Sequence, residues 1–118
     1  MKNIAKGIFR QRLLMEGHYE ISVNETVIEK YFVAICEHLN LKMYGKPIIF
    51  SPGDGGKKEN QGYDAFVPLI DSGISVYVWT NKKFVSIILY TCKGFNSDEA
   101  SAFTKSFFKL KELVSEEF

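Results

Sequence analysis

The sequence predicts an α+β fold, namely a two-layer α/β sandwich in which two helices cover one face of a mainly antiparallel sheet. Three observations lead to this prediction. The expected elements follow the order strand, helix, four strands, helix. The connections between the consecutive strands are too short for the crossovers that parallel strands require. Each expected helix carries one apolar stripe, which has to be buried against a large surface such as a sheet.

The first half of the chain contains an expected strand, a helix and a second, short strand. Residues 10–23 are interpreted as a long or bent edge strand. Asn24 is suited to cap the helix that follows, because its side chain can accept a hydrogen bond from a free amide of the first turn. Asn40 fits the end of this helix, and residues 46–50 form the short strand. Apolar residues at helical spacing define the buried face of the helix: Val27, Ile28, Tyr31, Phe32, Ile35 and Leu39.

Three apolar strands are expected in the second half, at residues 65–70, 74–80 and 84–91. The middle strand alternates, which places successive side chains on opposite faces of the sheet. One face receives Ile74, Val76 and Val78, and the other receives Ser75, Tyr77 and Trp79. The polar residues 81–83 predict a tight hairpin between the last two strands. Because the face with Tyr77 and Trp79 is partly aromatic, we expect a second copy of the sheet to cover it in a homodimer.

The last expected element is a helix that begins near Asn96, with Glu99 as its capping-box partner. Its apolar stripe runs over Ala100, Phe103, Phe107, Leu110 and Val114. Residues 53–62 hold four glycines and hardly any apolar side chain, so they predict a mobile surface loop. This segment does not match the glycine and lysine spacing of a phosphate-binding loop.

Length and composition narrow the possible classes. The chain has 118 residues and a mass of 13.5 kDa, which predicts one domain over residues 1–118. Its 15 Lys and Arg residues against 14 Asp and Glu give a formal charge of +1, which argues against a nucleic-acid partner. No apolar run reaches the about 18–20 residues that span a bilayer, so no membrane partner is expected. Cys36 and Cys92 do not have the spacing of a zinc site, so no metal site is expected. They also do not form a disulfide framework, so we expect two free thiols and a protein located in the reducing cytoplasm.

Two segments resemble a known family. They are Ile70–Asn81, IDSGISVYVWTN, and Leu89–Gly94, LYTCKG. Together they resemble the prokaryotic S-adenosylmethionine decarboxylases, small pyruvoyl enzymes of polyamine synthesis, whose signature reads roughly A-E-S-H-[IL]-S-I-H-T-W-P-E and is followed by F-T-C-G. The separation of 20 residues between Ser72 and Cys92 is the one that this family keeps. Phe50-Ser51-Pro52 resembles the family's F-x-P, and Gly62-Tyr63-Asp64 falls at its G-x-S.

The resemblance implies roles for particular residues. In the family, the hydroxyl of the signature serine attacks the preceding carbonyl, and elimination then leaves a pyruvoyl group that serves as an electron sink for decarboxylation. Ser72 matches that serine, so the implied cleavage lies between Asp71 and Ser72. Cys92 matches the proton donor, Phe50 an aromatic residue that stacks on the adenine of the substrate, and Asp71 the family's glutamate.

Four positions depart from the family pattern. Gly73 stands where the family has a histidine, Tyr77 where it has the histidine that assists self-processing, and Asp64 where it has the processing serine; Asn81 replaces an acid. A tyrosine, which titrates near pH 10, is a poor substitute for an imidazole that titrates near 6.5. We therefore expect a chain that is not self-processed and carries no cofactor. A processed chain would instead carry a pyruvoyl group derived from Ser72.

Three hypotheses for the function stay open at this point. The chain is a silent homologue that binds an S-adenosylmethionine-like small molecule, an active pyruvoyl decarboxylase, or an enzyme with other chemistry built from Asp64, Tyr77 and Cys92. The candidate residues also have purely structural interpretations. Ser72 and Asp64 suit turns, Cys92 suits the buried end of a strand, and Tyr77 and Trp79 suit an interface.

Overall fold

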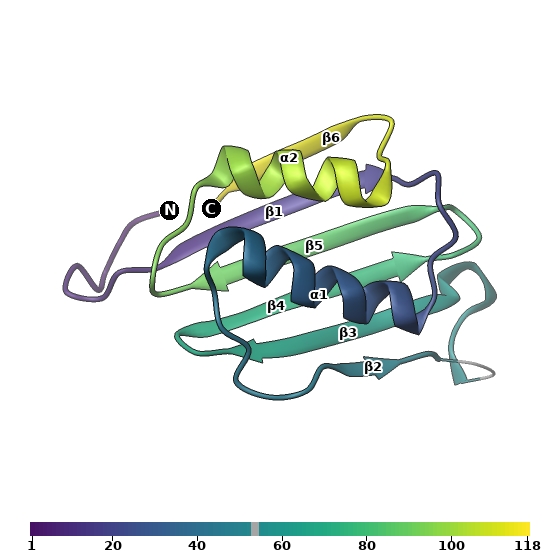
Figure 1. Cartoon of the computed structure of the whole chain (residues 1–118), viewed down its shortest axis with the longest axis horizontal. Helices are drawn as coiled ribbons and strands as arrows, with labels where there is room; N and C mark the ends of the chain where they lie inside the picture. The colour runs from purple at the N-terminus through teal and green to yellow at the C-terminus, as the bar shows by residue number, and fades with distance from the viewer. Residues whose placement is uncertain (53–54) are drawn as a thin grey trace.

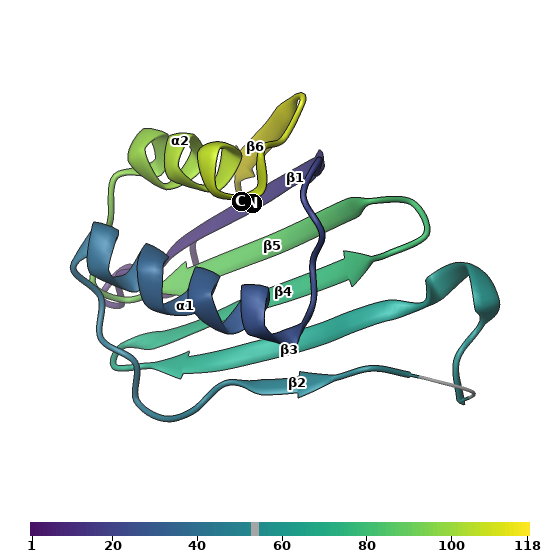
Figure 2. The same ribbon diagram turned by 45° about the vertical axis from the view of Figure 1, so that its right-hand side comes forward.

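The computed structural model of the chain describes residues 1–52 and 55–118 and confirms the α/β sandwich. Two helices lie over the same face of one six-stranded sheet, whose strand order is β2-β3-β4-β5-β1-β6 (Figures 1 and 2). All five pairs of neighbouring strands are antiparallel. The elements are β1 (Gln11–His18), α1 (Glu25–Leu39), β2 (Ile48–Phe50), the 3-10 helix η2 (Lys58–Asn60), β3 (Gly62–Leu69), β4 (Ser72–Trp79), β5 (Phe84–Thr91), α2 (Ser97–Phe108) and β6 (Leu113–Glu117).

Both helices begin where the sequence predicts. The side chain of Asn24 accepts a hydrogen bond from the Val27 amide, and the side chain of Asn96 accepts one from the Glu99 amide. Asn40 closes α1 in the left-handed conformation, with its amide donating to the carbonyls of Cys36 and Glu37. These caps satisfy backbone groups that the helix ends would otherwise leave without partners.

The prediction for the end of α2 is wrong. We expected the apolar stripe to continue through Val114, but the helix ends at Phe108 and Lys109 takes a left-handed conformation with φ 52°. Leu113–Glu117 form β6, which pairs with β1 and leaves Val114 59% exposed. The helical spacing of the stripe is a local signal, and backbone pairing with a distant strand overrides it.

The first strand is shorter than predicted and does not lie at the edge of the sheet. It ends at His18, and residues 19–23 cross from the sheet to α1. Because β6 pairs with the side of β1 that β5 leaves free, β1 lies inside the sheet. The predicted surface loop at 53–62 is described only in part, since Gly53 and Asp54 lie outside the described residues. The rest contains η2, and its last residue, Gly62, already belongs to β3.

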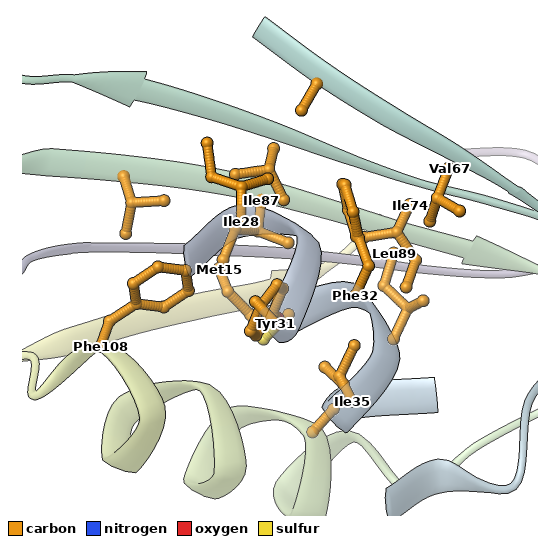
Figure 3. Close-up of a cluster of buried hydrophobic side chains, with 14 of the residues drawn as sticks. Met15, Ile28, Tyr31, Phe32, Ile35, Val67, Ile74, Ile87, Leu89 and Phe108 are labelled. Carbon is orange, nitrogen blue, oxygen red and sulfur yellow. The ribbon is translucent and has the colours of Figure 1, made fainter. Parts of the chain in front are cut away.

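The core fills the layer between the helices and the sheet. Figure 3 shows Tyr31, Phe32 and Ile35 of α1 facing Val67, Ile74 and Leu89 of the strands. From α2, the buried side chains are Ala100, Thr104 and Phe108. The predicted alternation of β4 is confirmed, because Ile74, Val76 and Val78 are buried under the helices whereas Ser75, Tyr77 and Trp79 are only partly covered.

A single side-chain hydrogen bond joins the two helices inside this core. The hydroxyl groups of Tyr31 and Thr104 lie 2.8 Å apart, and both side chains are fully buried. Burial disfavours the tyrosinate and raises the pKa of Tyr31 far above its ordinary value, while the hydrogen bond from Thr104 acts in the opposite direction. The pair therefore stays neutral and hydrogen-bonded.

We predict that Tyr31→Phe and Thr104→Val each lower the free energy of unfolding by about 1–2 kcal/mol, because each leaves the other hydroxyl buried without a partner. The double variant should lose less than the sum, because no polar group then lacks a partner. Urea denaturation of the four proteins measures the coupling, with Tyr44→Phe, at an exposed tyrosine, as the control. Strictly additive losses would contradict the interpretation.

Candidate functional site

The helices leave one face of the sheet uncovered, which we call the open face. Cross-strand pairing arranges its side chains in rows that run across the sheet. One row contains Val114, Glu16, Ser86, Tyr77, Asp64 and Phe50, in that order from β6 to β2. The next row contains Glu116, Leu14, Ile88, Ser75, Phe66 and Ile48. Of the six predicted site residues, Asp64 lies on β3, and Ser72 and Tyr77 lie on β4. Asp71 lies in the turn between these two strands, Cys92 directly follows β5, and Phe50 lies on β2.

Ser72 and Cys92 come together at one end of the sheet. The Ser72 hydroxyl donates a hydrogen bond to the Cys92 sulfur over 3.6 Å. The backbone amide of Cys92 donates to the carbonyl oxygen of Asp71 over 2.7 Å. The pairing of Ser72 with Thr91 creates both contacts, since Thr91 directly precedes Cys92. We call Asp71, Ser72 and Cys92 the serine–cysteine cluster.

The backbone of this cluster has an unusual conformation. Ile70 and Asp71 form the two-residue turn between β3 and β4, and Asp71 has a φ of 75°. Ser72 follows with a φ of 153°, which is rare for a residue with a side chain. The turn therefore ends at Asp71, whereas Ser72 and Gly73 already belong to β4, and the unusual angles belong to the residues on either side of the Asp71–Ser72 peptide bond.

Phe50, Asp64 and Tyr77 form a second group, which we call the tyrosine cluster. They are direct cross-strand neighbours on β2, β3 and β4. Asp64 and Tyr77 line a pocket of about 350 Å³, together with Pro52, Gly56, Lys57, Asn60, Val78 and Trp79. The indole of Trp79 donates to the side chain of Asn60 over 3.1 Å, which ties η2 to this pocket. A carboxylate beside several aromatic rings can bind a flat, positively charged molecule.

The two clusters do not meet within one chain. Ser72 and Tyr77 lie five residues apart on the same strand, which corresponds to about 17 Å at the rise of a β-strand. A single chain therefore does not bring Asp64, Tyr77 and Cys92 into one pocket. A single chain can use the clusters separately, or it can combine one cluster with the other cluster of a second copy.

Neither histidine lies beside Ser72. His18 packs against Phe84 with ring centroids 5.1 Å apart, at the end of the sheet opposite to Ser72. His38 stacks on Phe103 at 4.7 Å in the helical layer. Cys36 is buried in α1, and desolvation raises the pKa of its thiol to about 11. Cys92 is therefore the thiol that solvent can reach.

A ring from the neighbouring strand lies over Gly73. A Cβ at Gly73 would lie 2.5 Å from two ring atoms of Phe66, which occupies the neighbouring strand. The Phe66 ring thus fills the space that a residue after Ser72 would need.

Sequence reasoning also missed a polar pair in the middle of the open face. Ser86 donates a hydrogen bond to the carboxylate of Glu16 over 2.7 Å. Both residues stand in apolar runs, where their alternation with buried neighbours could have indicated an outward position.

Among the described residues, no group of three or more His, Cys, Asp or Glu side chains could hold a metal ion. No described helix is long and apolar enough to span a bilayer.

Comparisons with known proteins agree with this fold. The chain is similar to the crystal structure of the adenosylmethionine decarboxylase from Aquifex aeolicus VF5, with a TM-score of 0.69 and 16% sequence identity. The match covers 94% of this chain and 89% of that one, which shows that the two share a fold. The comparison with curated protein sequences gives no match.

The family comparison covers most of the chain. The sequence model described as S-adenosylmethionine decarboxylase matches residues 14–118. This range begins within β1 and contains all the later strands, both helices and both clusters. The chain therefore belongs to the S-adenosylmethionine decarboxylase family.

Proposed function

We propose that this member of the family is not self-processed and that it binds an S-adenosylmethionine-like small molecule without decarboxylating it. The surroundings of Ser72 carry this proposal. Its hydroxyl contacts the thiol of Cys92, Gly73 offers no side chain, and Tyr77 lies about 17 Å away along β4. Cleavage requires a group that takes the hydroxyl proton and later gives one back. No imidazole stands there to do so among the described residues.

The tyrosine cluster is the binding site in this proposal. S-adenosylmethionine combines an adenine ring with a positively charged sulfonium. Phe50 is 66% exposed and free to stack on a base, while the rings of Tyr77 and Trp79 and the Asp64 carboxylate favour a cation. The pocket volume of about 350 Å³ falls in the range of small-molecule sites.

We further propose that the chain forms a homodimer through the open face. Six large apolar side chains are exposed there: Ile48, Phe50, Phe66, Tyr90, Val114 and Phe118. A face of this kind is costly to leave in water and is typical of a protein interface. A two-fold axis would apply the same face of both copies to each other. The serine–cysteine cluster of one copy could then lie beside the tyrosine cluster of the other.

Both cysteines are free thiols, which favours a reducing compartment such as the cytoplasm.

A second candidate function, an active pyruvoyl decarboxylase, is favoured by the Asp71–Ser72 bond. Unusual φ angles flank this bond, and strained backbone conformations concentrate at functional sites. The Cys92 amide polarises the Asp71 carbonyl, which is the group that the Ser72 hydroxyl would attack. A pyruvoyl group at position 72 would supply the electron sink for decarboxylation. Cys92 would then hold a proton next to it. The two proposals differ in whether this peptide bond stays intact.

We predict that S-adenosylmethionine stabilises the protein, with a gain of about 2.7 kcal/mol when its concentration reaches one hundred times Kd. S-adenosylhomocysteine, which lacks the positive charge, should bind more weakly. Asp64→Asn should weaken binding of S-adenosylmethionine by about tenfold or more, because it removes the carboxylate that faces the cation. Thermal denaturation with each ligand measures the effect.

The matched control for this experiment is Glu29→Gln, which removes a negative charge from the exposed surface of α1. It should leave binding unchanged. The proposal fails if S-adenosylmethionine does not stabilise the wild-type protein, or if Asp64→Asn and Glu29→Gln behave alike.

For the assembly, we predict a particle of twice the chain mass of 13.5 kDa in light scattering after size-exclusion chromatography. Ile88→Glu should give monomers, because it buries a charge in the middle of the open-face row that also contains Leu14 and Phe66. Val33→Glu, on the outer surface of α1, is the matched control and should remain dimeric. A monomeric wild-type protein, or a dimeric Ile88→Glu variant, would rule out this interface.

A further inference from the structure

The guanidinium of Arg12 has an unusual environment on the open face. By strand pairing Arg12 lies between Tyr90 of β5 and Phe118, just beyond β6. Its guanidinium lies 5.6 Å from the centroid of the Phe118 ring, within the range of a cation–π contact. The Nε atom is shielded from solvent and has no hydrogen-bond partner among the described residues. Buried donors are nearly always paired, so this guanidinium is not fully satisfied by the described part of the chain.

A cavity of about 440 Å³ opens beside Arg12. It is lined by Met1, Lys2, Asn3, Lys6, Gly7, Ile8, Phe9, Arg10 and Arg12. Four of these side chains are cationic and none is acidic. No ion pair joins any of the four to a carboxylate within the part of the chain that the structure describes. The cavity therefore concentrates positive charge that the protein itself does not neutralise.

The N-terminal segment that forms this cavity is held in place by Arg10. The guanidinium of Arg10 donates to the carbonyls of Ala5 and Ile8 over 3.1 Å and 2.9 Å, and to the side chain of Asn3 over 2.9 Å. The segment thus curls around one arginine and forms the loop beyond the start of β1 in Figure 1. A loop that is already ordered loses less entropy when a ligand binds.

We propose that this cavity, which we call the arginine cavity, binds a small molecule that carries two or more oxyanion groups. The planar guanidinium of Arg12 can bind one oxyanion through two parallel hydrogen bonds, and Lys2 and Lys6 can neutralise a second. A ligand with several negative charges matches the four cations better than a single-charged ion does. Phosphate and carboxylate groups share this chemistry.

The site is separate from both clusters of the proposed function. None of its lining residues belongs to the serine–cysteine or tyrosine cluster. Loss of oxyanion binding would therefore not affect S-adenosylmethionine binding, and the two proposals can fail independently.

The test is titration calorimetry of the full chain at low ionic strength with inorganic pyrophosphate and, separately, with citrate. We expect binding of at least one of them, weakened as salt is added. Arg12→Gln should weaken it by about 10- to 100-fold, and Arg12→Lys, which keeps the charge but loses the planar fork, by several-fold. The preferred probe identifies phosphate or carboxylate as the recognised group.

Lys82→Gln/Lys83→Gln is the matched control, because it removes two lysines from the β4–β5 turn, at the other end of the sheet. This variant should bind both probes as the wild type does. Arg12→Gln should stay folded, because the substitution removes a donor that lacks a partner; circular dichroism checks this. The proposal is overturned if neither probe binds, if Arg12→Gln binds like the wild type, or if the control variant loses as much affinity.

Discussion

Antiparallel pairing along β4 fixes the relative positions of Asp64, Ser72, Tyr77 and Cys92. Its pairing with β5 sets Ser72 opposite Thr91 and thereby brings the Ser72 hydroxyl to the Cys92 sulfur. Its pairing with β3 sets Tyr77 opposite Asp64. A shift of this register by one residue would exchange the two faces of the strand. The buried side chains Ile74, Val76 and Val78 prevent such a shift, so the core and the functional clusters depend on the same pairing.

The same register separates the clusters. Because both lie on one rigid strand, no side-chain movement can bring Tyr77 to Ser72 in a single chain. The Phe66 ring also occupies the space beside Gly73, so a larger residue at position 73 would have to displace this ring, which belongs to a 42% exposed residue. Ser72 and Cys92, which resemble the family's signature serine and cysteine, are in contact, whereas histidines that the family pattern has near the serine are replaced by Gly73 and Tyr77. This combination is the physical basis for our proposal of an intact, ligand-binding member of the family.

Most of the fold could be predicted from the sequence because its signals are local. Asn24 and Asn96 cap helices, and the alternation of β4 appears in three consecutive residue pairs. The errors arose where distant backbone pairing decides the outcome. Residues 113–117 form a strand only because β1 offers them a partner, and β1 becomes an inner strand for the same reason. Likewise, Ser72 and Cys92 could be matched to the family by spacing, but the Phe66 ring at Gly73 and the Arg12 Nε, which has no partner among the described residues, depend on neighbours across the sheet.

The covalent state of the Asp71–Ser72 bond tests the central claim most directly. Intact-mass spectrometry of the purified protein, after long incubation at neutral pH, should give one species at the full chain mass of 13.5 kDa. Ser72→Ala, which cannot cleave, should give the same pattern. Two fragments in the wild type, residues 1–71 and 72–118, that are absent from Ser72→Ala would contradict the claim and establish the chain as a processed enzyme.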